Sequence, residues 1–193
     1  GGIDTNTYEC FMDTTSTLTY ENPTEFDMAT MQRIVAVVQT KELDAVIFDS
    51  QCFYQYAVNQ IVYDLREVLT PEQIEKYEPY LYYVDMDIVR AQEEEDVIVD
   101  TDAIAAKGNL TLEEIHELAA TRMDPSTMGD PVPVGIVMTD SPFAAESHSY
   151  DDLVPVFGIS VTTQRMDTCL QFLDYLWDDT VDFSLAHDEA TPY

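Results

Sequence analysis

The alternation of hydrophobic and polar positions predicts a chain in which strands and helices follow one another. Residues 43–48 form a short apolar run, rich in β-branched and aromatic side chains, that is typical of a strand buried on both faces. Ahead of it, apolar residues at helical spacing over 28–42 predict an amphipathic helix. The threonine-rich segment 7–22 is expected to be extended with a turn. Three later segments continue the alternation, the first two as strands and the third as a helix: 134–138, 154–161 and 166–177.

Two helix starts are marked by capping residues. Thr70, Pro71 and Gln73 have the spacing of an N-cap, a proline in the first helical position and a capping-box partner. Thr111 and Glu114 form a second capping box with the same spacing. Helices are therefore predicted to begin at residues 71 and 112.

The order of these elements favours an α/β sandwich. The stretch after the first buried strand predicts a short helix over 50–60, and 61–69 is expected to be extended before it turns. Residues 1–84 and 131–193 are interpreted as one discontinuous α/β domain. The acidic segment 85–130 differs in character, so it is expected to form a small insert or a reduced second lobe.

The charge of the chain narrows the range of partners. Its 193 residues include 38 acidic and 8 basic ones, which gives a formal net charge of -30. This excludes nucleic acid and anionic membrane surfaces as principal partners, because both would repel the protein. A solvated acidic surface and an adaptation to high salt both account for the excess of acidic residues.

No segment of the sequence is expected to cross a membrane. None reaches the roughly 18 consecutive apolar residues of a membrane span, and no signal peptide is present. The chain starts with Gly-Gly rather than Met. We therefore expect that an N-terminal signal or anchor has been removed and that the protein could be tethered to a membrane through it.

The cysteines and the paired carboxylates predict neither a disulfide framework nor a metal site. The three cysteines, which lie far apart among apolar residues, are interpreted as buried thiols: Cys10, Cys52 and Cys169. Asp85 with Asp87, and Asp100 with Asp102, resemble fragments of a calcium loop but lack its glycine and its final glutamate. No phosphate-binding glycine loop occurs either, so no cofactor and no metal are expected.

Asp49 is the strongest candidate for chemistry in the chain. The stretch AVIFDS, which it closes with Ser50, resembles the nucleophile strand of haloacid-dehalogenase-type phosphatases. Those enzymes need a second Asp two residues after the nucleophile and a Gly-Thr turn. Here Gln51 replaces the acid, and Cys52 and Phe53 replace the turn. We therefore expect no catalysis, with a phosphatase as the less favoured alternative.

Two predicted strands end in the same dipeptide, which suggests a shared site. If these strands are neighbours in a mostly parallel sheet, both Asp-Ser pairs lie at one edge, where such folds bind ligands. An aromatic residue a few positions after each pair could stack on a sugar ring or a cation. The alternative is that each pair only forms a turn or caps a helix, as Ser50 could do. The candidate ligand-binding residues are Asp49, Ser50, Tyr54, Asp140, Ser141 and Phe143.

Four segments carry a resemblance to a known family. The first is a helix that leads into a strand (31–50), and the second is an aromatic helix followed by an Asp-Leu segment (53–69). The third is a returning strand (130–138), and the fourth is a closing strand with its helix (156–177). In this order they resemble extracellular solute-binding proteins of the type 2 periplasmic fold. The resemblance implies a mixed sheet flanked by helices. It departs from the family at 85–130, which is too short for a full second lobe.

The resemblance also implies a function. It predicts a non-catalytic domain, extracellular or at the cell surface, that binds a small polar or cationic ligand. Because the second lobe is reduced, a ligand-free interaction or sensory domain is the alternative from a different class.

Overall fold

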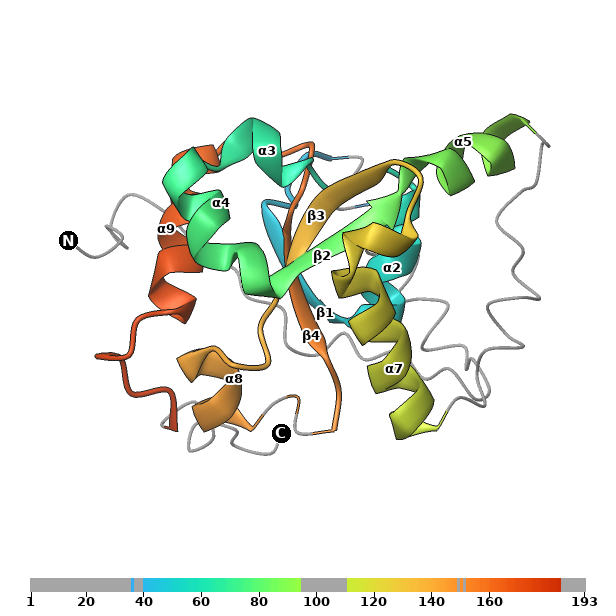
Figure 1. Ribbon diagram of the computed structural model, residues 1–193. Coiled ribbons are helices and arrows are strands. Elements are labelled where there is room, and N and C mark those ends of the chain that lie inside the picture. Colours follow the sequence, from blue (N-terminus) through green and yellow to red (C-terminus); the bar gives the residue numbers. More distant parts are fainter. Residues whose placement is uncertain (1–35, 37–39, 95–110, 149, 151, 185–193) are drawn as a thin grey trace.

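The computed structural model places one antiparallel sheet between two layers of helices (Figure 1). It describes residues 36, 40–94, 111–148, 150 and 152–184. The strands of the sheet stand in the order β1-β4-β3-β2, and every neighbouring pair is antiparallel. Their bounds are Ala45–Asp49 for β1, Leu81–Asp85 for β2, Pro131–Val137 for β3 and Pro155–Ile159 for β4.

The predicted α/β class is confirmed, whereas the predicted strand directions are wrong. The described strands form neither a mixed nor a mostly parallel sheet. The apolar runs had suggested parallel strands because both faces of each strand are buried. Helices cover both faces of this antiparallel sheet, as Figure 1 shows, and this coverage produces the same apolar pattern.

Each face of the sheet has its own hydrophobic core. One core lies under α2 (Ser50–Val58) and α7 (Leu112–Met123) and includes Phe53 and Tyr82. The other lies under α4 (Pro71–Tyr77) and α9 (Met166–Leu176), with the short α3 (Leu65–Val68) beside them. The remaining elements of the described residues are the helices α5 (Met86–Glu94) and α8 (Pro142–Ser147) and the 3-10 turns η1 (Glu78–Tyr80) and η2 (Pro125–Thr127).

Both predicted helix starts are confirmed. The Thr70 hydroxyl accepts from the Gln73 amide at 3.2 Å, while the Thr70 amide donates to the Gln73 side chain at 3.0 Å. The Thr111 amide donates to the Glu114 carboxylate at 2.7 Å in the same way. Each reciprocal pair satisfies amides that the first turn of a helix leaves without partners.

The segment 61–69 differs from the prediction. Val62 forms an isolated bridge to Ser160, just after β4, and the Tyr63 amide donates to the Ile159 carbonyl of β4 at 2.9 Å, but α3 follows at once. The reason is local, because the Asp64 carboxylate accepts from the Arg66 amide at 2.9 Å and starts a helical turn. Leu65 then turns into the core with no exposed surface.

Several predictions fall on residues that the structure does not describe. They concern the extended segment 7–22, most of the helix at 28–42, Cys10, and the pair Asp100 and Asp102. Cys52 and Cys169 are buried and form no disulfide, as expected. In the described part of 85–130, Val89 and Ala119 belong to the same core as the sheet. No helix in the described ranges is both long and apolar enough to cross a bilayer.

Phe53 fixes α2 on the sheet. Its side chain has no exposed surface and lies over two glycines, Gly135 of β3 and Gly158 of β4. A Cβ atom would lie 2.7 Å from the Phe53 Cζ atom at Gly135, and 2.6 Å from its Cε2 atom at Gly158. Neither glycine has a positive φ, so each is needed here for the close approach of the ring and not for backbone geometry.

We predict that Gly158→Ala destabilises the protein by about 1–3 kcal/mol, because the added methyl group displaces the Phe53 ring. Urea denaturation measures this cost. The same substitution in a Phe53→Leu background should cost less, because leucine leaves room for the methyl group. An equal cost in both backgrounds would show that the ring does not cause the effect.

Candidate functional site

The ends of β1 and β3 lie at one edge of the sheet. Both strands are antiparallel to β4, which stands between them, so they run in the same direction without being neighbours. β1 ends at Asp49, opposite Pro155, and the chain leaves β3 at Val137, three residues before Asp140. The two Asp-Ser pairs therefore follow strands that end on the same side of the molecule.

Asp49 is the N-cap of α2. Its Oδ1 atom accepts hydrogen bonds from the amides of Gln51 at 3.0 Å and Cys52 at 3.2 Å. The prediction that Ser50 caps this helix is wrong, because β1 continues through Asp49 and Ser50 is already the first helical residue. A carboxylate at the position before the helix reaches the orphan amides of the first turn directly.

The first turn of α2 buries polar atoms that have no hydrogen-bond partner. Ser50 has no exposed surface, and its Oγ atom makes no hydrogen bond with any residue that the structure describes. The Nε2 atom of Gln51, a residue that is 8% exposed, is in the same situation. Such groups each cost on the order of 1–3 kcal/mol, so they are uncommon in stable proteins and require an explanation.

A chain of hydrogen bonds joins this turn to α7. The Tyr82 hydroxyl donates to the Ser50 carbonyl at 3.0 Å and accepts from Arg122 Nη1 at 2.9 Å. The Arg122 guanidinium carbon lies 3.6 Å from the centre of the Tyr54 ring, in a cation–π contact. Burial raises the pKa of Tyr82 to about 12, against the opposing effect of Arg122. Tyr82 is thus a neutral, buried link between two surface elements.

The second Asp-Ser pair is arranged differently. Asp140 is exposed, whereas Ser141 is fully buried and caps α8. The Ser141 hydroxyl donates to the Met138 carbonyl at 2.7 Å and accepts from the Ala144 amide at 3.2 Å. Both hydrogen-bonding functions of this hydroxyl are used within the protein, so its geometry is that of a helix cap.

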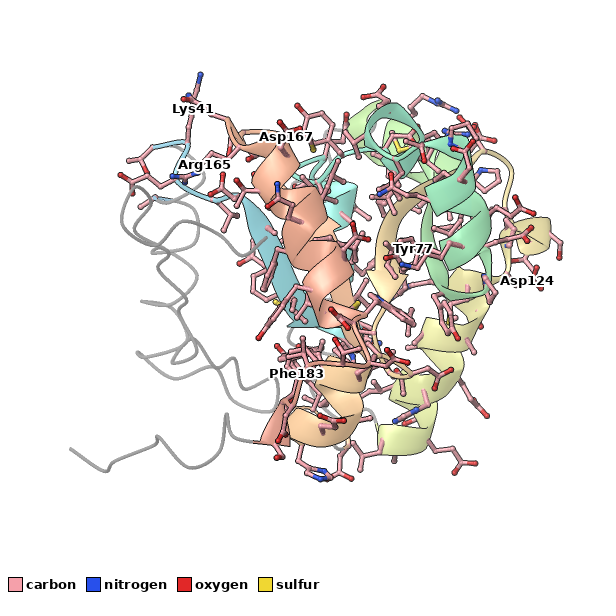
Figure 2. All side chains as sticks on the ribbon, turned by 90° about the vertical axis from the view of Figure 1, so that its left-hand side faces the viewer. Lys41, Tyr77, Asp124, Arg165, Asp167 and Phe183 are labelled. Carbon is pink, nitrogen blue, oxygen red and sulfur yellow. The ribbon has the colours of Figure 1, made fainter. Side chains whose placement is uncertain are left out.

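Phe143 of α8 belongs to a group of aromatic side chains. Its ring lies 5.7 Å from that of Phe183, which is in turn 5.2 Å from Tyr175 of α9. The Phe183 amide donates to the Glu146 carboxylate at 2.9 Å. Figure 2 shows Phe183 beside α8, at the end of α9 opposite Arg165. These contacts hold the segment after α9 against α8.

Tyr150 connects the two halves of the predicted site. Its hydroxyl donates to the Ile47 carbonyl of β1 at 3.0 Å, and its ring lies 6.5 Å from that of Phe143. Burial raises the pKa of Tyr150 to about 12, with further contributions from Asp49 and Cys52. Tyr150 therefore contacts β1 two residues before Asp49, and it also contacts Phe143.

The structure thus divides the predicted residues into groups. Asp49 caps α2, which carries Ser50 and Tyr54, whereas Phe143 of α8 is connected to β1 through Tyr150. Sequence reasoning did not identify Tyr82, Arg122 or Tyr150 as parts of this site. No spacing rule could have found them, because their partners are 32 to 103 residues away along the chain.

No group of three or more His, Cys, Asp or Glu side chains in the described part of the chain is arranged to hold a metal ion. The pair Asp85 and Asp87 has other partners. Asp85 accepts from the amides of Gly129 at 2.9 Å and Asp130 at 3.1 Å, and Arg90 bonds both Asp87 and Asp130 at 2.7 Å. These carboxylates tie β2 and α5 to the start of β3.

Comparison with known proteins gives no match to this chain. No family model fits it, and no curated protein and no solved structure is significantly similar. The functional argument therefore depends on the geometry around the first turn of α2.

We predict that the protein loses stability as pH rises from about 10 to about 12. Tyr82 and Tyr150 keep their protons in the folded state at pH values where the unfolded chain, with a tyrosine pKa near 10.0, has lost them. A shift of about two pKa units corresponds to about 2.7 kcal/mol per tyrosine.

Urea denaturation across this pH range tests the effect. Tyr150→Phe should remove part of the alkaline loss, whereas Tyr175→Phe, at a side chain that is 48% exposed, should keep the wild-type profile. Identical profiles for Tyr150→Phe and the wild type would contradict the assignment of the loss to Tyr150.

Proposed function

We propose that this chain is a non-catalytic, extracytoplasmic domain, related to solute-binding proteins, that binds a small polar solute at the first turn of α2. The observation that carries the proposal is the pair of buried, partnerless polar atoms in this turn, Ser50 Oγ and Gln51 Nε2. A buried polar atom that the fold itself does not satisfy calls for a partner, and a bound solute would supply one here. The extracytoplasmic location is supported only by the resemblance in the order of segments.

The surroundings of this turn suit the recognition of a small solute. Tyr54 and Tyr150 are partly buried, and each therefore combines an apolar face with some access from outside. Arg122 and Tyr82 supply polar groups in fixed positions. A few well-placed polar groups among aromatic side chains are the usual composition of a ligand site.

The role of Asp49 decides between ligand classes. Its Oδ1 atom already accepts two amide hydrogen bonds, which offset part of the charge that would attract a cation. The proposal therefore favours polar solutes over purely cationic ones. Two observations argue against Asp49 as the nucleophile of a phosphatase. Its Oδ1 atom is engaged in the helix cap, and the residue two positions later is Gln51, which cannot act as a general acid.

A thermal-shift screen of sugars, amino acids, polyamines and divalent ions tests the proposal. At least one neutral or zwitterionic solute should raise the melting temperature in a saturable way. Asp49→Asn should fold normally, because asparagine is an equally good N-cap, and should bind that solute about tenfold more weakly if Asp49 contacts it.

Asp64→Asn is the matched control, because Asp64 also caps a helix, α3, but lies outside the proposed site. This variant should keep the wild-type affinity. A screen in which no solute gives saturable stabilisation would refute the proposed function, and equal losses in both variants would remove Asp49 from the site.

A further inference from the structure

Arg122 differs from the other arginines that the structure describes. Each of these has a carboxylate partner: Arg66 bonds Asp64 at 2.7 Å, Arg90 bonds Asp87 and Asp130 at 2.7 Å, and Arg165 Nε bonds Asp44 at 2.8 Å. Arg122 has no carboxylate within ion-pair distance among the described residues, although the chain holds 38 acidic side chains. In so acidic a protein, a partly buried guanidinium without a carboxylate is unexpected.

The position of the Arg122 guanidinium is fixed by neutral groups. Its face lies against the Tyr54 ring at 3.6 Å, and one of its N–H groups donates to the Tyr82 hydroxyl at 2.9 Å. Tyr82 has no exposed surface and is itself anchored to the Ser50 carbonyl. The guanidinium is therefore held in one orientation before any ligand arrives, which lowers the entropic cost of binding. Its other N–H groups make no hydrogen bond within the described residues.

The neighbouring groups without partners are also able to donate. Gln51 Nε2 is a donor only, and the Ser50 hydroxyl can donate its proton. The hydrogen-bond chain from Arg122 through Tyr82 ends on Ser50, so these groups belong to one region of the protein. A region with an excess of donors is complementary to a group that only accepts hydrogen bonds.

We propose that Arg122 binds a carboxylate group of the solute, through the guanidinium N–H groups that make no hydrogen bond within the described residues. A planar guanidinium matches a carboxylate with two parallel hydrogen bonds. A phosphate would fit the same fork, but its higher charge is repelled more strongly by a protein with a net charge of -30. The assignment rests on the proposed function, because the carboxylate is taken to be part of the bound solute.

Acetate and its neutral analogue acetamide provide the direct test. At constant ionic strength, acetate at up to about 50 mM should raise the melting temperature by about 5 °C for a millimolar dissociation constant, and acetamide should not. Constant ionic strength is needed because salt alone screens the repulsion between the acidic side chains. In the wild-type protein, acetate should also shift the amide NMR signals of Ser50 and Gln51 more than those of α9.

Arg122→Gln should abolish the acetate effect, and Arg122→Lys should weaken it, because lysine keeps the charge without the fork. Arg66→Gln removes the same charge from a surface ion pair and should keep the effect. If acetamide acts like acetate, if Arg122→Gln retains the shift or if phosphate binds in preference to acetate, the carboxylate assignment is refuted. A screened solute that binds the wild type and Arg122→Gln equally would refute this assignment alone and leave the proposed function standing.

Discussion

The contact of Phe53 with two glycines determines how α2 lies on the sheet. Because Gly135 and Gly158 have no side chains, the Phe53 ring approaches β3 and β4 closely. The helix α2, which carries Phe53, therefore lies close to the sheet as well. Phe53 also meets the edge of Tyr82, with ring centres 5.5 Å apart. The first turn of α2 and the Tyr82 hydroxyl are thus positioned by the same packing. The candidate site depends on this contact, because both of its fixed elements are placed by it.

Several acidic side chains among the described residues stabilise the fold by accepting hydrogen bonds from backbone amides. Asp49 and Asp64 cap helices, and Asp85 accepts from the backbone before β3. Hydrogen bonds from the Gly129 and Asp130 amides lower the pKa of Asp85, and those from Thr111 lower the pKa of Glu114. A lowered pKa means that the ionised form stabilises the fold above the ordinary pKa of the carboxyl group, and that this contribution is lost as pH falls.

The sequence predicted local features well and long-range ones poorly. The capping boxes at Thr70 and Thr111 and the strand ending at Asp49 follow from neighbouring residues alone. Strand direction could not be predicted, because a sheet covered by helices on both faces buries its strands equally in either direction. The contacts that define the site join Tyr82 to Arg122 and Tyr150 to Ile47 across 40 and 103 residues, so they depend on the tertiary fold.

The electrostatics of the whole protein and those of the candidate site oppose each other. The net charge of -30 repels any anion at long range, whereas the proposed site would attract one at contact distance through Arg122 and the donors of the first turn. At physiological ionic strength, salt largely screens the repulsion between charges that are more than about 8–10 Å apart. Contacts in a partly buried site are screened much less. An anionic group would therefore be retained only if it fits the fixed guanidinium, since loose electrostatic attraction is absent. If the proposed carboxylate binding holds, this combination favours selectivity over rapid association. The anion would have to fit Arg122, the one arginine without a carboxylate partner among the described residues.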